Sequence, residues 1–270
     1  MGTTIKRCFG VPDLPLRSLA DSLAAACRKS DSCSFSYPSD EENTRHYFLL
    51  EGKTLLAALA LVFFDENEPA ECVAFTHPDH RRHGFFSRLL THARRDYPGI
   101  LLLFSVNDSC APALAVLRHL DAKLQCRELS MELDFRMNPG MIPKIACTAK
   151  SLPDRYFLRS HKEKDGTVRW KLYTIGQNPR SFCTFAGSAL TSPAGDCSVC
   201  FHQVEIRPTL RGRGLGGTLL RLILTRLADT GTARILLHVS ADNLPAVSLY
   251  KKTGFRVRET LSFYLYQPFT

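Results

Sequence analysis

The chain has 270 residues, 44% hydrophobic and 23% charged, a composition that fits an ordinary globular protein of one large or two small domains. Its longest apolar run, at 55–64, is shorter than the roughly 18 residues that a membrane-spanning helix needs, and the first ten residues lack a signal-peptide core, so we expect a cytoplasmic protein that does not bind membranes. The net charge of +9 is uneven: residues 1–135 hold 15 Lys and Arg against 18 Asp and Glu, whereas residues 136–270 hold 20 against 8.

The first half shows alternating strand and helix patterns. Runs rich in β-branched and aromatic residues predict strands, and apolar residues spaced by three and four predict helices. We expect strands at 55–64, 71–77, 100–108 and 128–135, and helices at 84–97 and 111–120.

The second half begins with three strand-like runs, separated by the turn sequences QNPR and PAGD. This spacing predicts an antiparallel meander of strands at 170–176, 181–192 and 197–206. Leucines at helical spacing then predict a helix that starts near Leu215 and ends at Gly231. A strand at 233–240, a short helix within 243–255 and a last strand at 260–267 complete the half.

The two halves resemble each other. A shift of 130 residues lays 77–90 over 207–220, with a proline, an arginine, a glycine and two leucines coinciding, which indicates an internal duplication. Two prolines and a glycine interrupt the periodic patterns at 137–144. We therefore expect two domains, at 1–136 and 137–270.

The most informative stretch is RPTLRGRGLGG at 207–217, directly before the leucine-rich helix. The first turn of a helix has backbone N–H groups without intrahelical partners and a partial positive charge, so it attracts anions. Glycines at 212, 214 and 216 let a pyrophosphate approach the backbone, and Arg211 and Arg213 add positive charge. The alternative is a glycine-rich surface turn without a ligand.

Two other phosphate motifs fit this stretch less well. A P-loop requires a lysine that is absent here. Gly212, Gly214 and Gly217 satisfy the dinucleotide-binding pattern, with Asp242 as a ribose-binding acid. However, RPTLR separates the preceding strand from the first glycine, and only 28 residues follow Asp242, too few for a doubly wound sheet.

The stretches VEIRPTLRGRGLGG at 204–217 and NLPAVSLYKKTGF at 243–255 together closely resemble the GNAT superfamily of acyl-CoA-dependent N-acetyltransferases. The resemblance implies an α/β (α+β) fold of two GNAT-like units in tandem, each a mixed, mainly antiparallel sheet flanked by helices. It also implies that acetyl-CoA is the acyl donor and that its pantetheine arm pairs with the backbone of Val204 and Ile206 like an added strand. The other implied cofactor contacts are Arg211, Gly212, Arg213, Gly214, Leu215, Gly216, Gly217 and Asn243.

The resemblance makes Tyr250 the acid that protonates the departing CoA thiolate. A neutral phenol with a pKa of about 10 can protonate a thiolate whose conjugate acid has a pKa of about 8.5. The base that deprotonates the attacking amine is open between Glu205, His202 and an ordered water, and we favour Glu205. Strand alternation places residues 202, 204 and 206 on one face and 205 on the other, so His202 and Glu205 are not expected to face the substrate together.

The first half keeps Arg81 and Gly84 but has Phe86 where the second half has Gly216, and Leu117 where it has Tyr250. We interpret it as a degenerate copy that supports the second half, with a second acyl-CoA site as the alternative.

The sequence as a whole predicts an N-acetyltransferase that transfers an acetyl group from acetyl-CoA to a primary amine, of a small molecule or a peptide, by direct attack in a ternary complex. The alternative is a non-catalytic acyl-CoA-binding sensor or scaffold. No cysteine has the context of an activated nucleophile. We expect no nucleic-acid partner, because no basic motif with interleaved aromatic residues occurs, and no metal, because Cys197 and Cys200 have no second pair of ligands.

Overall fold

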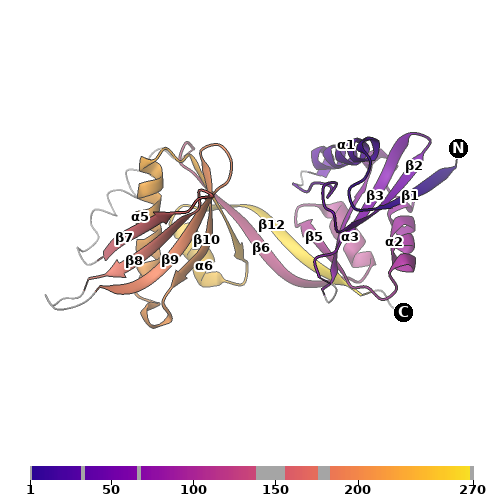
Figure 1. The fold of residues 1–270 in the computed structure, drawn as a ribbon. Coiled ribbons are helices and arrows are strands. Elements are labelled where there is room, and N and C mark those ends of the chain that lie inside the picture. Colours follow the sequence, from indigo (N-terminus) through magenta and orange to yellow (C-terminus); the bar gives the residue numbers. More distant parts are fainter. Residues whose placement is uncertain (1, 32–33, 66–67, 138–155, 176–182, 268–270) are drawn as a thin grey trace. The chain divides into compact units, whose positions relative to one another are not determined.

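The computed structural model describes residues 2–31, 34–65, 68–137, 156–175 and 183–267 (Figure 1). Contacts divide the chain into two compact units, Met1–Arg127 with Thr260–Thr270, and Glu128–Glu259. We call them unit 1 and unit 2. The chain passes from unit 1 to unit 2 within β6 (Lys123–Asp134) and returns within β12 (Arg256–Tyr266). The expected domains, 1–136 and 137–270, remain a prediction, since most of the expected linker lies outside the described residues.

Unit 1 is a mainly antiparallel sheet with helices on both faces. Its strand order is β1-β2-β3-β4-β5-β12, and only the β4–β5 pair is parallel. The strands are β1 (Thr3–Phe9), β2 (Thr44–Glu51), β3 (Thr54–Val62), β4 (Ala70–Thr76), β5 (Leu102–Asn107) and the end of β12. Helix α2 (Phe85–Asp96) closes one apolar core, together with α3 (Ala111–His119). Helix α1 (Leu14–Asp31) closes a separate core on the other face.

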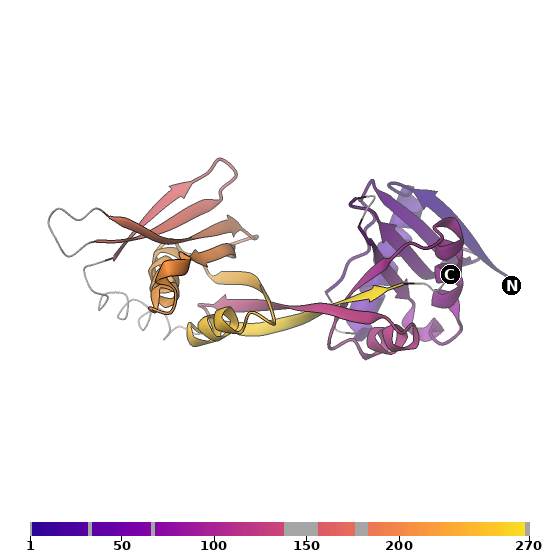
Figure 2. The ribbon, with the colours of Figure 1, turned by 90° about the horizontal axis from the view of Figure 1, so that it is seen from below.

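Unit 2 repeats this plan with fewer described helices. Its strand order is β6-β11-β10-β9-β8-β7. The expected meander is confirmed as β8 (Val168–Thr174), β9 (Thr184–Pro193) and β10 (Ser198–Ile206), preceded by β7 (Tyr156–Lys162) and followed by β11 (Arg234–Ser240), which runs parallel to β10. Figure 2 shows α5 (Leu215–Asp229) on one face of these strands. Its leucines and Ile223 form the core with Trp170, Leu172 and Phe201.

The predicted fold class is therefore confirmed: each unit is a mixed, mainly antiparallel sheet flanked by helices. The predicted strands and helices are found with ends displaced by a few residues, β6 excepted, which begins five residues earlier than expected. The sequence patterns did not reveal β1, α1, β2 or β7.

The duplicated stretches have the same backbone conformation. In each unit a short 3₁₀ turn, Pro78–His80 or Pro208–Leu210, leads to a glycine in the left-handed region that precedes the helix. That glycine is Gly84 (φ 73°) before α2 and Gly214 (φ 77°) before α5.

Among the described residues, no helix combines the length and apolar character that crossing a bilayer requires.

Candidate functional site

The centre of unit 2 is a place where two parallel strands separate. β10 and β11 pair only from Ser198 to Phe201, within the described residues, whereas β9 follows β10 to its end. The N–H of Arg207 donates to the carbonyl of Ala186 on the β9 side (2.9 Å). Because successive residues of a strand direct their backbone groups to opposite edges, the N–H and C=O of Ile206 point to the open edge. That edge can accept an added strand.

A β-bulge shapes the same end of β10. The register with β9 shifts between His202 and Glu205, and Gln203 takes a positive φ of 47°. Gly187 on β9 is required by this close approach, because a Cβ there would lie 2.5 Å from the carbonyl oxygen of Glu205.

The bulge corrects one sequence prediction. His202 lies opposite Leu190 and Glu205 opposite Ser188, and these two β9 residues are two positions apart. His202 and Glu205 therefore share one face of the sheet. The alternation argument was wrong here because the extra residue of a bulge reverses the phase of the strand.

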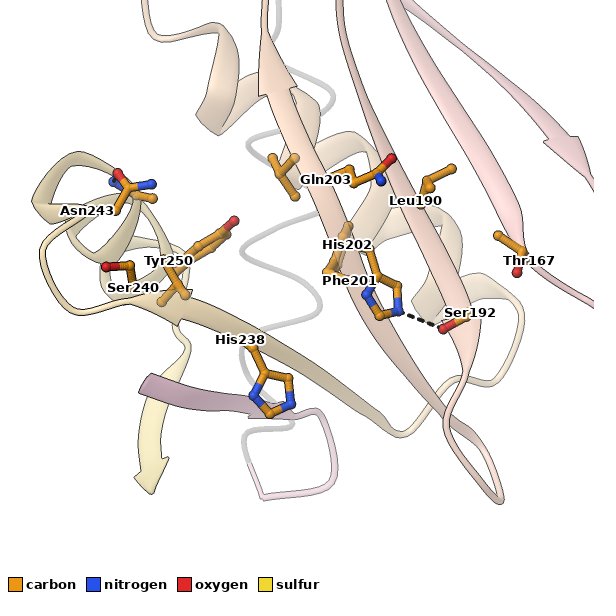
Figure 3. A pocket seen from close by; sticks show the side chains of 13 residues that line it. Thr167, Leu190, Ser192, Phe201, His202, Gln203, His238, Ser240, Asn243 and Tyr250 are labelled. Atoms are coloured by element: carbon orange, nitrogen blue, oxygen red, sulfur yellow. Dashed lines mark hydrogen bonds between the residues drawn. The ribbon is translucent and has the colours of Figure 1, made fainter. Parts of the chain in front are cut away.

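A pocket of about 690 Å³ lies between the separated strands (Figure 3). It is lined by the β10 residues 201–204, by the β11 residues 238–240 and by α6 (Leu244–Lys252), the short helix that follows. Its walls also include Thr167, Leu190, Ser192, Asn243, Ala246 and Tyr250. Of its lining, His202, Leu190 and Ser192 lie on the sheet face away from α5.

Tyr250 occupies the wall on the α6 side. Figure 3 shows its hydroxyl directed from α6 toward β10. The ring is buried against Phe255, with the two ring centres 5.7 Å apart. Burial raises the pKa of Tyr250 above its ordinary value, so its phenol stays protonated at neutral pH. The structure thus presents a neutral O–H donor inside the pocket.

The two side chains considered as bases differ in position. His202 lines the pocket, and its Nε2 lies 2.8 Å from the Ser192 hydroxyl oxygen. Glu205 is exposed beyond the lining, with an oxygen 3.8 Å from an Arg211 nitrogen. His202 is therefore the nearer of the two to the space enclosed by the pocket.

The glycine turn leads into the N-terminus of α5. Thr218 is the first residue whose N–H bonds within the helix, to the carbonyl of Gly214 (3.2 Å), and no side chain caps this end. The N–H groups of residues 215–217 thus lack helix partners, as an anion site requires. Arg211 braces the turn, since its Nε donates to the carbonyl of Ile206 (3.0 Å).

The glycines of the turn serve different purposes. Gly212 and Gly214 have φ values of 76° and 77°, and a Cβ at either would meet nothing within 4 Å. At Gly216 a Cβ would lie 3.0 Å from Leu249 of α6, so this glycine lets two helices pack closely. At Gly217 it would meet only the flexible Arg221 guanidinium, also at 3.0 Å. The side chain of Leu215 is buried in the core, so only its backbone faces the turn.

Asn243 has a structural task as well as a place in the pocket wall. Its side-chain oxygen accepts the N–H of Ala246 (3.3 Å) and so caps α6. The capping role alone accounts for an asparagine at this position, without a contact between its side chain and a cofactor.

The free helix N–H groups, the open turn and the unpaired edge of β10 follow one another along the chain. Their chemistry fits acetyl-CoA, since N–H groups suit a pyrophosphate and an unpaired strand edge suits the two amides of pantetheine.

Unit 1 has the turn, an uncapped N-terminus of α2 and strands that separate, since among the described residues β4 and β5 pair only at Ala70 and Glu71, but it lacks the bulge and the tyrosine. Arg81, the counterpart of Arg211, makes two hydrogen bonds to the Asp31 carboxylate at the end of α1 (2.8 and 2.7 Å). β4 pairs with β3 without a register shift, so it has no bulge like that of β10. Helices α3 and α6 have equal lengths, and Leu117, at the position of Tyr250, is buried in the core.

Comparison with known proteins identifies the family. Residues 151–255 match the model of the Acetyltransferase (GNAT) family. A mycothiol acetyltransferase of Streptomyces scabiei (strain 87.22) is 28% identical over 246 residues, which cover 81% of this chain and 79% of the relative. Residues 151–255 belong to the GNAT acetyltransferase family. A mycothiol acetyltransferase of Corynebacterium jeikeium (strain K411) is 50% identical over 67 residues, 25% of this chain and 19% of the relative.

Solved structures confirm the tandem GNAT fold. A GCN5-related N-acetyltransferase from Sphaerobacter thermophilus matches with a TM-score of 0.71 at 13% identity, over 98% of this chain and 97% of the other. A tandem GNAT protein from the clavulanic acid biosynthesis pathway matches with a TM-score of 0.63 at 16% identity, over the full length of both chains. At such identities the likeness concerns the fold of this GNAT protein.

Three features of the GNAT site were missed in the sequence: the bulge at Gln203, the close contact that requires Gly187, and the hydrogen bond between Ser192 and His202. A glycine within a strand pattern is a recognised sign of a bulge or of a close backbone approach, so AGS at 186–188 could have revealed the first two. Cys197 lies in the turn before β10 (φ 51°) and Cys200 on the strand, and among the described residues no group of three metal-binding side chains occurs.

Proposed function

We propose that unit 2 binds acetyl-CoA and transfers its acetyl group to a primary amine by direct attack. The observation that carries this proposal is the separation of β10 from β11 before the glycine turn, with the Tyr250 hydroxyl directed toward β10 (Figure 3); in unit 1 the strands also separate, but Leu117 takes the place of the tyrosine. One continuous stretch, residues 204–217, then offers a strand edge that β11 does not pair with and free N–H groups at a helix N-terminus.

In this proposal the residues of the turn hold the diphosphate, and the backbone of Val204 and Ile206 pairs with the pantetheine amides. When bound, acetyl-CoA supplies the thioester carbonyl that the amine attacks. The Tyr250 hydroxyl lies in the pocket wall and donates its proton to the thiolate as the carbon–sulfur bond breaks. Burial keeps this proton in place until it is needed.

The amine loses a proton to a base on the sheet face that His202 and Glu205 share. We assign this role to Glu205, acting through a water because the carboxylate lies outside the pocket lining. His202 is the second candidate, because it lines the pocket directly. If Glu205 is the base, Glu205→Gln lowers kcat/KM at low pH and His202→Gln does not; the reverse result assigns the role to His202.

The acceptor is the least defined part of the proposal. The relatives that match most of the chain are called mycothiol acetyltransferases. An acceptor related to mycothiol is therefore the first to test, followed by a panel of small amines and short peptides.

The donor site is tested by calorimetric titration with acetyl-CoA. Gly212→Asp and Gly214→Asp each place a carboxylate in the turn, and Gly212→Asn and Gly214→Asn are matched controls with the same shape and backbone strain but no charge. We expect about one acetyl-CoA per chain, lost in the Asp variants and retained in the Asn variants. Equal affinities of the Asp and Asn variants would contradict the placement of the phosphates, and about two per chain would show that unit 1 binds as well.

A further inference from the structure

Basic side chains of β7, β8 and β10 lie on the sheet face of unit 2 that carries His202, and we call them the basic band. Cross-strand pairing defines two rows on this face, because residues directly opposite each other point to the same side. The rows are His202–Leu190–Arg169–His161 and Glu205–Ser188–Lys171–Arg159, each running from β10 to β7. The band therefore begins at the edge of the pocket.

On β7 and β8 the band forms a groove of about 470 Å³. It is lined by Arg159, Ser160, His161, Arg169, Lys171 and Tyr173. The Arg159 guanidinium lies over the stacked rings of Phe157 and Tyr173, 5.4 and 5.6 Å from their centres, which holds it in position. Arg169 is paired with Glu163 (3.0 Å), while Lys171 is exposed. The groove is thus a preformed basic surface.

Unit 1 shows what the same face looks like when the protein itself covers it. There His46 and Phe48 of β2 lie opposite Ala60 and Ala58 of β3, and both β2 side chains are fully buried. Helix α1 packs over Phe48 and the two alanines.

In unit 2 the corresponding β9 positions are Leu190 and Ser188, and the residues opposite them are Arg169 and Lys171. Two buried positions of one unit are exposed cations in the other. In unit 2 the side chains of Arg169 and Lys171 are exposed, and among the described residues no helix packs over them, whereas α1 covers their counterparts in unit 1.

We propose that this groove binds an anionic part of the acceptor, so that unit 2 acetylates amines that carry carboxylate or phosphate groups. The inference rests on the proposed function. Arg169 and Lys171 lie two strands away from β10, which corresponds to about 10 Å at a strand spacing of about 4.8 Å. An acceptor that reaches from β10 to Arg169 or Lys171 therefore spans about 10 Å, the length of about three residues of extended chain.

Binding of small polyanions to the enzyme saturated with CoA tests the groove, because CoA occupies the turn before α5. The probes are tripolyphosphate and tricarballylate, titrated separately at low ionic strength, and the tighter of the two shows whether phosphate or carboxylate is preferred. We expect saturable binding that Arg159→Gln with Lys171→Gln weakens at least about tenfold, since each substitution removes a charge-assisted contact. Lys6→Gln with Lys53→Gln removes two exposed charges of unit 1 and serves as the matched control.

Each outcome decides the inference. Absence of saturable binding to the wild-type enzyme, or equal affinities in the groove variant and the wild type, would overturn it. Acetyl-CoA titration of the same proteins before CoA is added shows whether the groove variant is folded and separates the two proposals. If acetyl-CoA does not bind the wild type, the proposed function fails. If acetyl-CoA binds but the affinity for the polyanions does not depend on Arg159 and Lys171, only the proposal of the groove fails.

Discussion

Replacement of Tyr250 by Phe removes one oxygen atom from the pocket and little else. Among the described residues no hydrogen bond holds this hydroxyl, and the ring keeps its edge contact with Phe255 when the oxygen is removed. We therefore expect a change of less than about 1 kcal/mol in the free energy of unfolding. The acetyl-CoA affinity should also remain close to that of the wild type, because the phosphate and pantetheine contacts assigned above lie elsewhere.

The expected loss is in kcat. A positioned general acid contributes about 10²- to 10⁴-fold. At about 1.36 kcal/mol for each factor of ten, this is a barrier increase of roughly 3 to 5 kcal/mol. Because burial raises the pKa of Tyr250, the wild-type enzyme should show no loss of kcat from deprotonation of this residue below about pH 10.

Steady-state release of CoA, measured with the first acceptor found, gives kcat for the wild type, for Tyr250→Phe and for Tyr156→Phe. The last is a matched control, since Tyr156 packs at the edge of the same core. We expect Tyr250→Phe to lower kcat at least about 10²-fold. A kcat within about twofold of the wild type would show that the thiolate departs without this proton. If the wild type binds acetyl-CoA but releases no CoA with any amine, the sensor function would be favoured.

Three further predictions concern stability. Gly187→Ala should lower the free energy of unfolding by about 1 to 3 kcal/mol and weaken acetyl-CoA binding, because its Cβ would lie 2.5 Å from a backbone oxygen of β10; an unchanged Tm and affinity would contradict this. Burial lowers the pKa of His46 to about 4, so stability should be constant above pH 6.5 and fall by roughly 3 kcal/mol toward pH 4; in urea titrations His46→Gln should remove that slope. Arg81→Gln should cost about 3 kcal/mol, because it leaves the mostly buried Asp31 carboxylate unpaired, whereas Arg17→Gln, whose partner is exposed, should cost less than about 1 kcal/mol.

The elements that the sequence revealed are those with strong local signals. The helix from Leu215 has regular leucine spacing, and the strands of the meander are bounded by Pro and Gly turns, so both were found close to their predicted ranges. The repeated turn was found because a proline, an arginine, a glycine and two leucines coincide in the two halves, and the shared glycine takes a left-handed backbone in both units. Local chemistry was sufficient for these parts.

The parts that were missed depend on contacts across the sheet. Nothing in the β10 sequence alone shows that Gln203 adds a residue, since the bulge exists only relative to β9, and it places His202 and Glu205 on one face. The glycine at 216 looked like part of a phosphate site, yet it also has a packing role that depends on Leu249, 33 residues later. Strand alternation and glycine spacing describe one segment at a time.

The comparison of the two units explains how one turn can serve two purposes. In both units an arginine after the 3₁₀ turn donates to the end of the preceding strand, through Arg81 to Thr76 and through Arg211 to Ile206. In unit 1 the rest of the guanidinium is bound by Asp31 of α1, and the face beneath α1 is apolar and covered. In unit 2 the arginine is exposed, the strand beside it is bulged, and the same face carries cations. The turn itself is common to both units; among the described residues, the bulge, Tyr250 and the exposed cations distinguish unit 2, and the proposed donor and acceptor sites rest on them.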